Sequence, residues 1–251
     1  MKIGFIGCGN MGSAMISGIL KKGIFQKDEI IVSNLTEEGS KRSREKLGVV
    51  TTLDNRQVVK NAKTIVLAVK PQFYQEVIEE VWADLTPEHM VIGVAAGKSL
   101  DWIQEICQTS LKVARLMPNT PAQVGEGMTG VCRNELVTDD DLEQVLKITD
   151  SFGKTQVVPE RLMDAVGAVS GCSPAYVFIF IEAMADAAVA QGLSLIHIST
   201  ISVALMSIMQ FHLAIRPHKM AGGKRDLEWI FSVLFLTDLV TEILLQRIWA
   251  L

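Results

Sequence analysis

The sequence predicts an α/β protein with a doubly wound parallel sheet, followed by an all-helical C-terminal domain. Through the first 160 residues, short apolar runs alternate with amphipathic helical segments, which is typical of βαβ units. A glycine-rich turn joins the first such run to the first helix. After residue 160 the alternation stops and the pattern becomes helical throughout. We therefore expect one domain over residues 1–160 and a second, helical domain over residues 161–251.

The glycine-rich turn is the most informative stretch of the chain. Residues 2–6 suit one buried strand and residues 11–20 suit a helix. Three glycines with G-x-G-x-x-G spacing, at positions 7, 9 and 12, span the turn and the start of that helix. The first glycine permits a tight turn, the second lets a pyrophosphate approach the backbone, and the third lets the helix pack closely on the sheet. The helix N-terminus attracts phosphate. This stretch predicts a Rossmann-type dinucleotide site formed by Gly7, Cys8, Gly9, Asn10, Met11 and Gly12.

The end of the second strand, residues 29–33, bears on the choice of cofactor. In βαβ units that bind NAD, an Asp or Glu at this position binds the ribose 2′-hydroxyl. Here Ser33 and Asn34 occupy it, and the next helix carries Lys41, Arg42 and Arg44. Small polar groups near cations favour a 2′-phosphate, so we expect NADP (NADPH), with NAD as the alternative. The cations could instead form a solvated helix face.

Further strands are expected at residues 49–51, 64–68, 90–93, 112–117 and 155–158, with helices at 56–61, 73–81, 100–106 and 139–152. Ligands of such sheets lie beyond the carboxyl ends of the strands. Three expected strands end in short stretches of small residues or prolines: residues 68–71 (AVKP), 94–97 (VAAG) and 117–121 (MPNTP). The prolines could also simply end strands. The remaining expected cofactor contacts are Asn55, Ala68, Val69, Lys70, Pro71, Ala95 and Ala96.

Composition limits the class of protein. Hydrophobic residues make up 49% of the chain and charged residues 21%, as in a globular protein. The formal net charge of −4 argues against nucleic acid as the main partner. The four cysteines are scattered without a C-x-x-C pair, and no signal peptide precedes the first strand. We therefore expect a cytoplasmic protein with reduced thiols.

Residues 168–176 (AVSGCSPAY) form the next distinctive stretch. Ser173 suits an N-cap and Pro174 a first helical residue. The helix expected at residues 175–191 is apolar nearly all round, which is typical of a core or an oligomer interface. Its free N–H groups would suit a substrate carboxylate. Glu182 and Asp186 lie four residues apart, but no further ligand is near them in sequence, so we expect no metal.

These motifs together resemble pyrroline-5-carboxylate reductase over residues 1–193: GCGNMG at 7–12, AVKP at 68–71, MPNTP at 117–121 and AVSGCSPAY at 168–176. The resemblance implies reduction of 1-pyrroline-5-carboxylate to L-proline by NADPH or NADH, the last step of proline biosynthesis. It also implies homodimers, which often form a ring of five dimers. It places Glu160 near the substrate. Backbone donors around residues 170–175 would neutralise the substrate carboxylate, so the expected substrate contacts also include Ser170, Gly171, Ser173, Pro174 and Ala175. No catalytic acid or base is assigned.

A second family with the same plan, the β-hydroxyacid dehydrogenases, uses a helical lysine as acid-base catalyst. This chain has no lysine between Lys154 and Lys219. That absence favours imine over alcohol chemistry, since a protonated imine is already an electrophile.

The resemblance stops after Leu193. The family's S-P-G-G-T-T loop, which supplies a substrate threonine, is missing, and Gly222 and Gly223 are followed by Lys224 and Arg225. Residues 187–215 lack charges and are long enough to span a membrane. Three interpretations compete: a repacked helical domain, a membrane hairpin, or a tail foreign to the reading frame. The abrupt loss of every family feature at one point favours the third. The hairpin is least favoured, because the run begins inside the expected buried helix. The alternative function is a catalytically inactive NADP-binding module.

Overall fold

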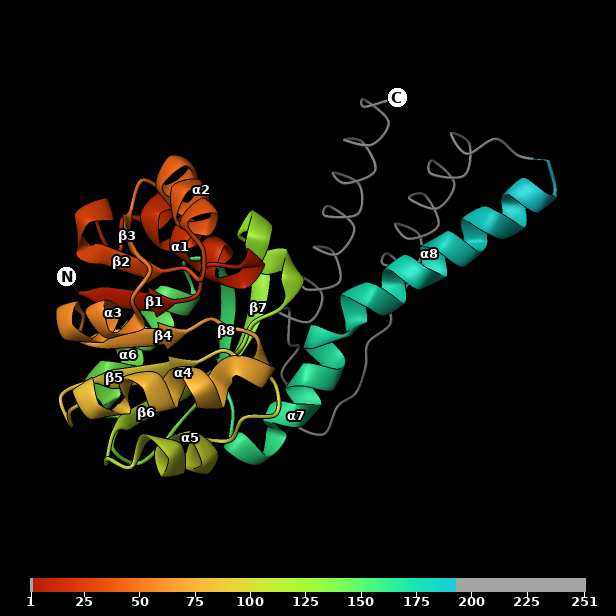
Figure 1. Ribbon diagram of the computed structural model, residues 1–251. Coiled ribbons are helices and arrows are strands. Elements are labelled where there is room, and N and C mark those ends of the chain that lie inside the picture. Colours follow the sequence, from red (N-terminus) through yellow and green to blue (C-terminus); the bar gives the residue numbers. More distant parts are fainter. Residues whose placement is uncertain (1, 193–251) are drawn as a thin grey trace. The chain divides into compact units, whose positions relative to one another are not determined.

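The computed structural model describes residues 2–192, and its centre is one eight-stranded sheet (Figure 1). The strand order is β3-β2-β1-β4-β5-β6-β7-β8, so the chain leaves the first strand in opposite directions along the sheet. This reversal between β1 and β4 is the switch point at which doubly wound sheets bind their ligands. The strands are β1 Ile3–Ile6, β2 Ile30–Ser33, β3 Val50–Thr52, β4 Thr64–Leu67, β5 Met90–Gly93, β6 Lys112–Met117, β7 Gly127–Arg133 and β8 Gly153–Val157.

The sheet is parallel from β3 through β6, as predicted, and β7 departs from the prediction. β7 pairs antiparallel with β6, and β8 pairs parallel with β7, so these two strands run opposite to the other six. β7 is not predicted from the sequence, because its residues, GMTGVCR, contain two glycines and lack a strong apolar pattern. Pairing on both sides stabilises it in spite of this composition.

Helices cover both faces of the sheet. Side chains from α3, α4 and α5 pack with one set of strand residues, and those from α1, α2 and α6 pack with the other. The helices on the two faces are α1 Asn10–Lys22, α2 Glu37–Leu47, α3 Asn55–Asn61, α4 Tyr74–Val81, α5 Leu100–Cys107 and α6 Asp139–Thr149. Short 3₁₀ turns lie between the elements: η1 Lys27–Glu29, η2 Pro71–Phe73, η3 Trp82–Asp84 and η4 Thr120–Val124. Burial on both faces explains why the parallel strands are continuous apolar runs.

Side-chain caps define where several helices start. Thr36, Asp54, Ser99 and Thr138 each accept a backbone N–H from the first turn of α2, α3, α5 and α6 respectively. Such caps satisfy donors that have no partner within the helix. The predicted helix and strand positions are confirmed to within a few residues, and β5 and β6 match their predicted limits.

The helical region after β8 differs from the prediction. A single helix runs through residues Glu160–Ala190, comprising η5 Glu160–Leu162, α7 Met163–Val166, a π-helical turn η6 at Gly167–Gly171, and α8 Ser173–Ala190. The prediction of a helix start at Ser173 is therefore wrong. Its hydroxyl donates to the carbonyl of Val169 in the preceding turn. The π turn allows the helix to continue through residues 170–174 (SGCSP), a stretch of a kind that usually ends a helix.

The chain divides into two compact units, residues 1–173 and 174–251. The boundary at residue 160 inferred from the sequence stays a prediction. α8, taken by itself, exposes large apolar side chains: Tyr176, Phe178, Ile179, Phe180 and Val189. Among the described residues, helix Glu160–Ala190 is the one with the length and mean hydropathy, 1.5, to cross a bilayer. A helix covered by a partner subunit meets the same criteria. The predictions for the tail after Leu193 lie outside the described residues.

Candidate functional site

The glycine-rich turn has the geometry of a phosphate-binding loop. Gly7 has a φ of +92°, and a Cβ there would lie 2.9 Å from the carbonyl oxygen of Ala68. Gly9 precedes α1 without any side-chain cap, and a Cβ on it would meet nothing within 4 Å. A Cβ on Gly12 would lie 2.9 Å from the Gly7 carbonyl oxygen. The loop therefore needs glycine at 7 and 12 for its own packing, whereas at 9 the space is open for a ligand.

A cleft with a volume of about 250 Å³ opens beside this loop, between α1 and α2. Arg42 and Lys46 bring positive charge to it from α2, next to the first turn of α1. Unpaired N–H groups and the positive end of the helix dipole add to this charge. The cleft suits a phosphorylated ligand. It is lined by Cys8, Gly9, Asn10, Ser13, Ala14, Ser17, Gly39, Arg42, Ser43, Lys46, Leu47 and Gln123.

The cations predicted from the sequence are not equivalent in the structure. Arg42 lines the cleft, although its Nη2 also lies 3.2 Å from Glu38 in an exposed pair. Arg44 instead pairs with Glu37, and Lys41 lies 4.0 Å from Glu45. Exposed ion pairs of this kind contribute little to the free energy of folding. The Arg42 side chain can therefore leave Glu38 to bind an anion in the cleft. Lys46 was missed, because its approach to the cleft depends on how α2 packs against α1.

The two residues predicted at the end of β2, Ser33 and Asn34, have side chains in different surroundings. Ser33 is buried, and its hydroxyl lies 3.5 Å from the Phe5 carbonyl oxygen. The side-chain oxygen of Asn34 accepts a hydrogen bond from Ser43 at 3.4 Å, and its Nδ2 is buried without a partner. Asn34 is thus linked to the cleft through Ser43, whereas the Ser33 side chain faces the interior.

Asn55, at the start of α3, donates from Nδ2 to the Glu80 carboxylate at 2.7 Å. Its side chain therefore already has a partner on α4. It stays a predicted cofactor contact.

The end of β4 lies beside the glycine loop, as the motif position predicted, and β5 is the next strand along the sheet. A Cβ on Gly7 would approach Val69 Cγ1 at 2.8 Å, and the Ala68 N–H donates to Ile6. Lys70 and Pro71 are exposed at the start of η2. Ala95 is buried after β5, and Ala96 is exposed. Met11 is half-buried in the first turn of α1. The glycine loop and the residues directly after β4 thus lie together at the carboxyl edge of the central strands, and their contact with a cofactor stays a prediction.

A buried arginine organises the region around Glu160. Arg115, in the middle of β6, is only 4% exposed, and its guanidinium lies 3.6 Å from Glu160 and 3.1 Å from Asp164. Glu160 also accepts the N–H of Leu100, the first residue of α5, at 2.6 Å. A carboxylate is favoured at a helix N-terminus. Glu160 therefore ties β6, α5 and the beginning of the long helix together. Arg115 is not among the residues predicted from the sequence, although a single charge inside an apolar strand is a signal for such a residue.

The π turn holds the predicted substrate residues Ser170 and Gly171. Asn119, from the MPNTP motif, donates from Nδ2 to the carbonyl and hydroxyl oxygens of Ser170 at 3.3 and 3.2 Å, and its Oδ1 accepts the Met128 N–H at 2.8 Å. Two motifs separated by 51 residues thus meet. Ser173, Pro174 and Ala175 continue the helix, so they do not offer the free N–H groups of a helix start.

Two known sequence families match the chain. Residues 2–97 match the family described as NADP oxidoreductase, coenzyme F420-dependent. Residues 160–206 match pyrroline-5-carboxylate reductase dimerisation. This second match continues past Leu193, where the resemblance drawn from the sequence ends.

Named relatives and solved structures agree with these matches. The pyrroline-5-carboxylate reductases of Methanosarcina acetivorans and Escherichia coli are 40% and 41% identical over 192 residues, 76% of this chain and 71% of theirs. The NADP-bound pyrroline carboxylate reductase of Plasmodium falciparum aligns with a TM-score of 0.76 and 25% identity over 97% of both chains. The pyrroline-5-carboxylate reductase of Coxiella burnetii has a TM-score of 0.76 and 30% identity, covering 99% of this chain and 95% of its own. The chain belongs to the pyrroline-5-carboxylate reductase family.

Proposed function

We propose that this protein catalyses the NAD(P)H-dependent reduction of 1-pyrroline-5-carboxylate to L-proline, the last step of proline biosynthesis. The observation that carries the proposal is the glycine loop between β1 and α1. Its open position at Gly9 lines a cationic cleft, and Gly7 in the same loop lies against Ala68 and Val69, directly after β4. The named relatives at 40% and 41% identity are reductases of this substrate. None of these comparisons supports the alternative of an inactive module.

The residues of the first domain fit a dinucleotide. Backbone N–H groups of Asn10, Met11 and Gly12 begin α1 and have no partner within the helix, so they suit the pyrophosphate. The nicotinamide, when bound, supplies the hydride that reduces the imine carbon. The loops after β4 and β5 would hold the ring, because they lie on the far side of the switch point from β2.

We further propose a preference for NADPH. Arg42 and Lys46 supply two cations to the cleft beside the end of β2, and no carboxylate lines it among the described residues. A 2′-phosphate would gain charge-assisted hydrogen bonds there. The ribose of NADH would leave the cations without an anionic partner, so NADH remains a weaker alternative cofactor.

For the substrate, we propose a site around Glu160, Ser170, Gly171, Ser173, Pro174 and Ala175. Ser170 supplies a hydroxyl whose position is fixed by Asn119. Reduction of the protonated imine needs one hydride at carbon, and the nitrogen already carries its proton. The chain therefore has to orient the imine and balance the substrate carboxylate, which relies on proximity more than on a protein acid.

Assembly and location extend the proposal. The dimerisation match over residues 160–206 supports a homodimer, and the exposed apolar side chains of α8 suit a partner's helices. A ring of dimers is the finer assembly that we propose. The four cysteines are free, which suits a reducing cytoplasm.

The test is NADPH oxidation by the full 251-residue chain with 1-pyrroline-5-carboxylate. We expect a fall in absorbance that requires the substrate, with proline formed in equal amount. Gly9→Val is the control for site-dependent turnover. NADPH binding without any substrate-dependent oxidation would favour the inactive module instead.

A further inference from the structure

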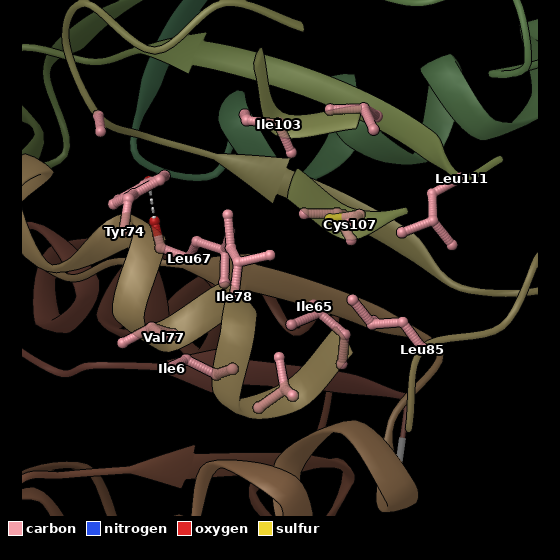
Figure 2. Close-up of a cluster of buried hydrophobic side chains, with 14 of the residues drawn as sticks. Ile6, Ile65, Leu67, Tyr74, Val77, Ile78, Leu85, Ile103, Cys107 and Leu111 are labelled. Atoms are coloured by element: carbon pink, nitrogen blue, oxygen red, sulfur yellow. Dashed lines mark hydrogen bonds between the residues drawn. The ribbon is translucent and has the colours of Figure 1, made fainter. Parts of the chain in front are cut away.

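Tyr74 places a hydroxyl group inside the apolar layer beneath α4. The side chain is fully buried among Ile78, Ile103 and other apolar residues. Its hydroxyl donates to the Leu67 carbonyl at 2.5 Å and accepts the Val94 N–H at 2.9 Å. Figure 2 shows the tyrosine ring beside Leu67 with the bond between them dashed. The buried hydroxyl thus has a partner both as a donor and as an acceptor within the protein.

The two partners of this hydroxyl are the ends of adjacent strands. Leu67 is the last residue of β4 and pairs in register with Gly93, the last residue of β5. Val94 follows directly, and its N–H lies 3.4 Å from the Leu67 carbonyl oxygen, a long contact for a rung of the ladder. The tyrosine hydroxyl therefore bridges the rung at which β4 and β5 begin to separate.

Packing alone does not account for a tyrosine here. A phenylalanine would fill the same volume without burying a polar group, and such burial costs free energy unless the group is paired. Burial raises the pKa of Tyr74 well above its ordinary value, so the hydroxyl keeps the proton that it donates to Leu67. A Cβ on Gly93 would lie 3.9 Å from the Tyr74 oxygen, an ordinary contact, and 3.0 Å from Cδ1 of Ile103, so the tight neighbour at this position is Ile103.

The bridge is located directly before two predicted cofactor loops. Residues 68–71 follow Leu67, and Ala95 and Ala96 follow Val94. In this strand order the adenosine half of a dinucleotide lies on the β1–β2 side of the switch point. The loops after β4 and β5 are therefore on the nicotinamide side, and the separation of these strands sets the surface on which the nicotinamide half lies.

We propose that Tyr74 is a positioning residue for the nicotinamide half of the cofactor. It acts through Leu67 and Val94 by fixing the separation of the β4 and β5 ends. This inference rests on the proposed dinucleotide-dependent function. It assigns Tyr74 no contact with the reacting atoms.

The test compares two ligands on the full-length Tyr74→Phe variant. Dissociation constants are measured for NADPH and for adenosine 2′,5′-bisphosphate, which lacks the nicotinamide half. We expect NADPH affinity to fall by about five- to tenfold, as for the loss of one buried hydrogen bond. The bisphosphate should bind within about twofold of the unmodified chain. Tyr176→Phe, which removes an exposed hydroxyl from α8, is the matched control and should change neither constant.

Three outcomes contradict different claims. Equal NADPH affinity in the unmodified chain and Tyr74→Phe overturns the positioning role. An equal loss for both ligands assigns Tyr74 to general stability and also overturns it. If the unmodified chain does not bind NADPH, the proposed function fails instead.

A second measurement covers the case in which Tyr74→Phe does not fold. Amide hydrogen exchange of the unmodified chain is followed at Val94. We expect NADPH to slow exchange there and adenosine 2′,5′-bisphosphate to leave it unchanged. If NADPH slows exchange in α1 but not at Val94, the bridge is not coupled to the nicotinamide half and the inference is wrong.

Discussion

The side-chain amide of Asn119 donates to the carbonyl oxygen of Ser170, which lies four residues before Pro174. In an α-helix this carbonyl would accept the N–H of the residue four positions later, and proline has none. Asn119 supplies the donor that Pro174 lacks. The same amide reaches the Ser170 hydroxyl at 3.2 Å. One side chain thus compensates for the proline and fixes the orientation of a proposed substrate residue.

Asn119→Ala should damage both stability and the use of the substrate. It leaves the Met128 N–H and Ser170 carbonyl without their partner, at a cost of about 1–3 kcal/mol in unfolding free energy. We expect kcat/KM for 1-pyrroline-5-carboxylate to fall by about tenfold or more, with NADPH affinity kept within about twofold. Denaturant unfolding and steady-state kinetics measure these changes. Asn61→Ala, which removes an exposed bond to Gln57, is the control. Unchanged kcat/KM would remove Ser170 from the site.

Gly9→Val should abolish NADPH binding without unfolding the protein. A Cβ at this position meets no protein atom within 4 Å, so we expect the valine side chain to extend into the space left for the pyrophosphate. Its melting temperature should therefore stay close to that of the unmodified chain. Gly12→Ala is the contrast, because its Cβ would press on the Gly7 carbonyl and lower stability. Retained NADPH affinity in Gly9→Val would show that the dinucleotide lies elsewhere.

Arg42→Gln should reduce the preference for NADPH over NADH. Arg42 lines the cleft and would pair with the 2′-phosphate, which NADH lacks. We expect NADPH affinity to fall by about tenfold and NADH affinity to stay within about twofold. Lys41→Gln, one residue away but outside the residues that line the cleft, should change neither. Side-by-side dissociation constants at fixed salt decide the matter, and tighter binding of NADH by the unmodified chain would contradict the assignment.

The four cysteines should react in two classes. Burial raises the pKa of both Cys107 and Cys132 to about 11, so their thiols stay protonated near neutral pH. Cys172 is exposed, and Cys8 is partly exposed in the glycine loop. At about pH 8 a thiol reagent should label Cys8 and Cys172 first, and NADPH should slow labelling of Cys8 alone. Equal labelling of Cys8 with and without NADPH would argue against a cofactor over this loop.

Sequence reasoning located the strands before β7 because each is a short apolar run between helical segments. It missed β7 because a strand with two glycines has little local signal, and its pairing with β6 is decided by distant contacts. It also placed a helix start at Ser173, since Ser-Pro is a good N-terminal pair. The π turn and the donor from Asn119 allow the helix to pass through, and neither is visible in local sequence.

For the site, the motifs predicted which loops meet but not where each side chain points. Ser33 lies at the predicted strand end, yet its hydroxyl faces inward to Phe5. Lys46 reaches the cleft only because α2 packs beside α1. Side-chain direction and helix packing are tertiary properties, whereas the glycine spacing is a local requirement of the turn. The glycine loop was therefore the safest prediction.

The most direct test of the central claim follows the hydride. The unmodified 251-residue chain is incubated with 1-pyrroline-5-carboxylate and NADPH carrying deuterium at the reactive position of the nicotinamide, and proline is analysed by mass spectrometry. The account predicts L-proline with one deuterium on the former imine carbon, in amounts equal to the NADPH consumed. Proline without deuterium, or NADPH binding without proline formation, would contradict it.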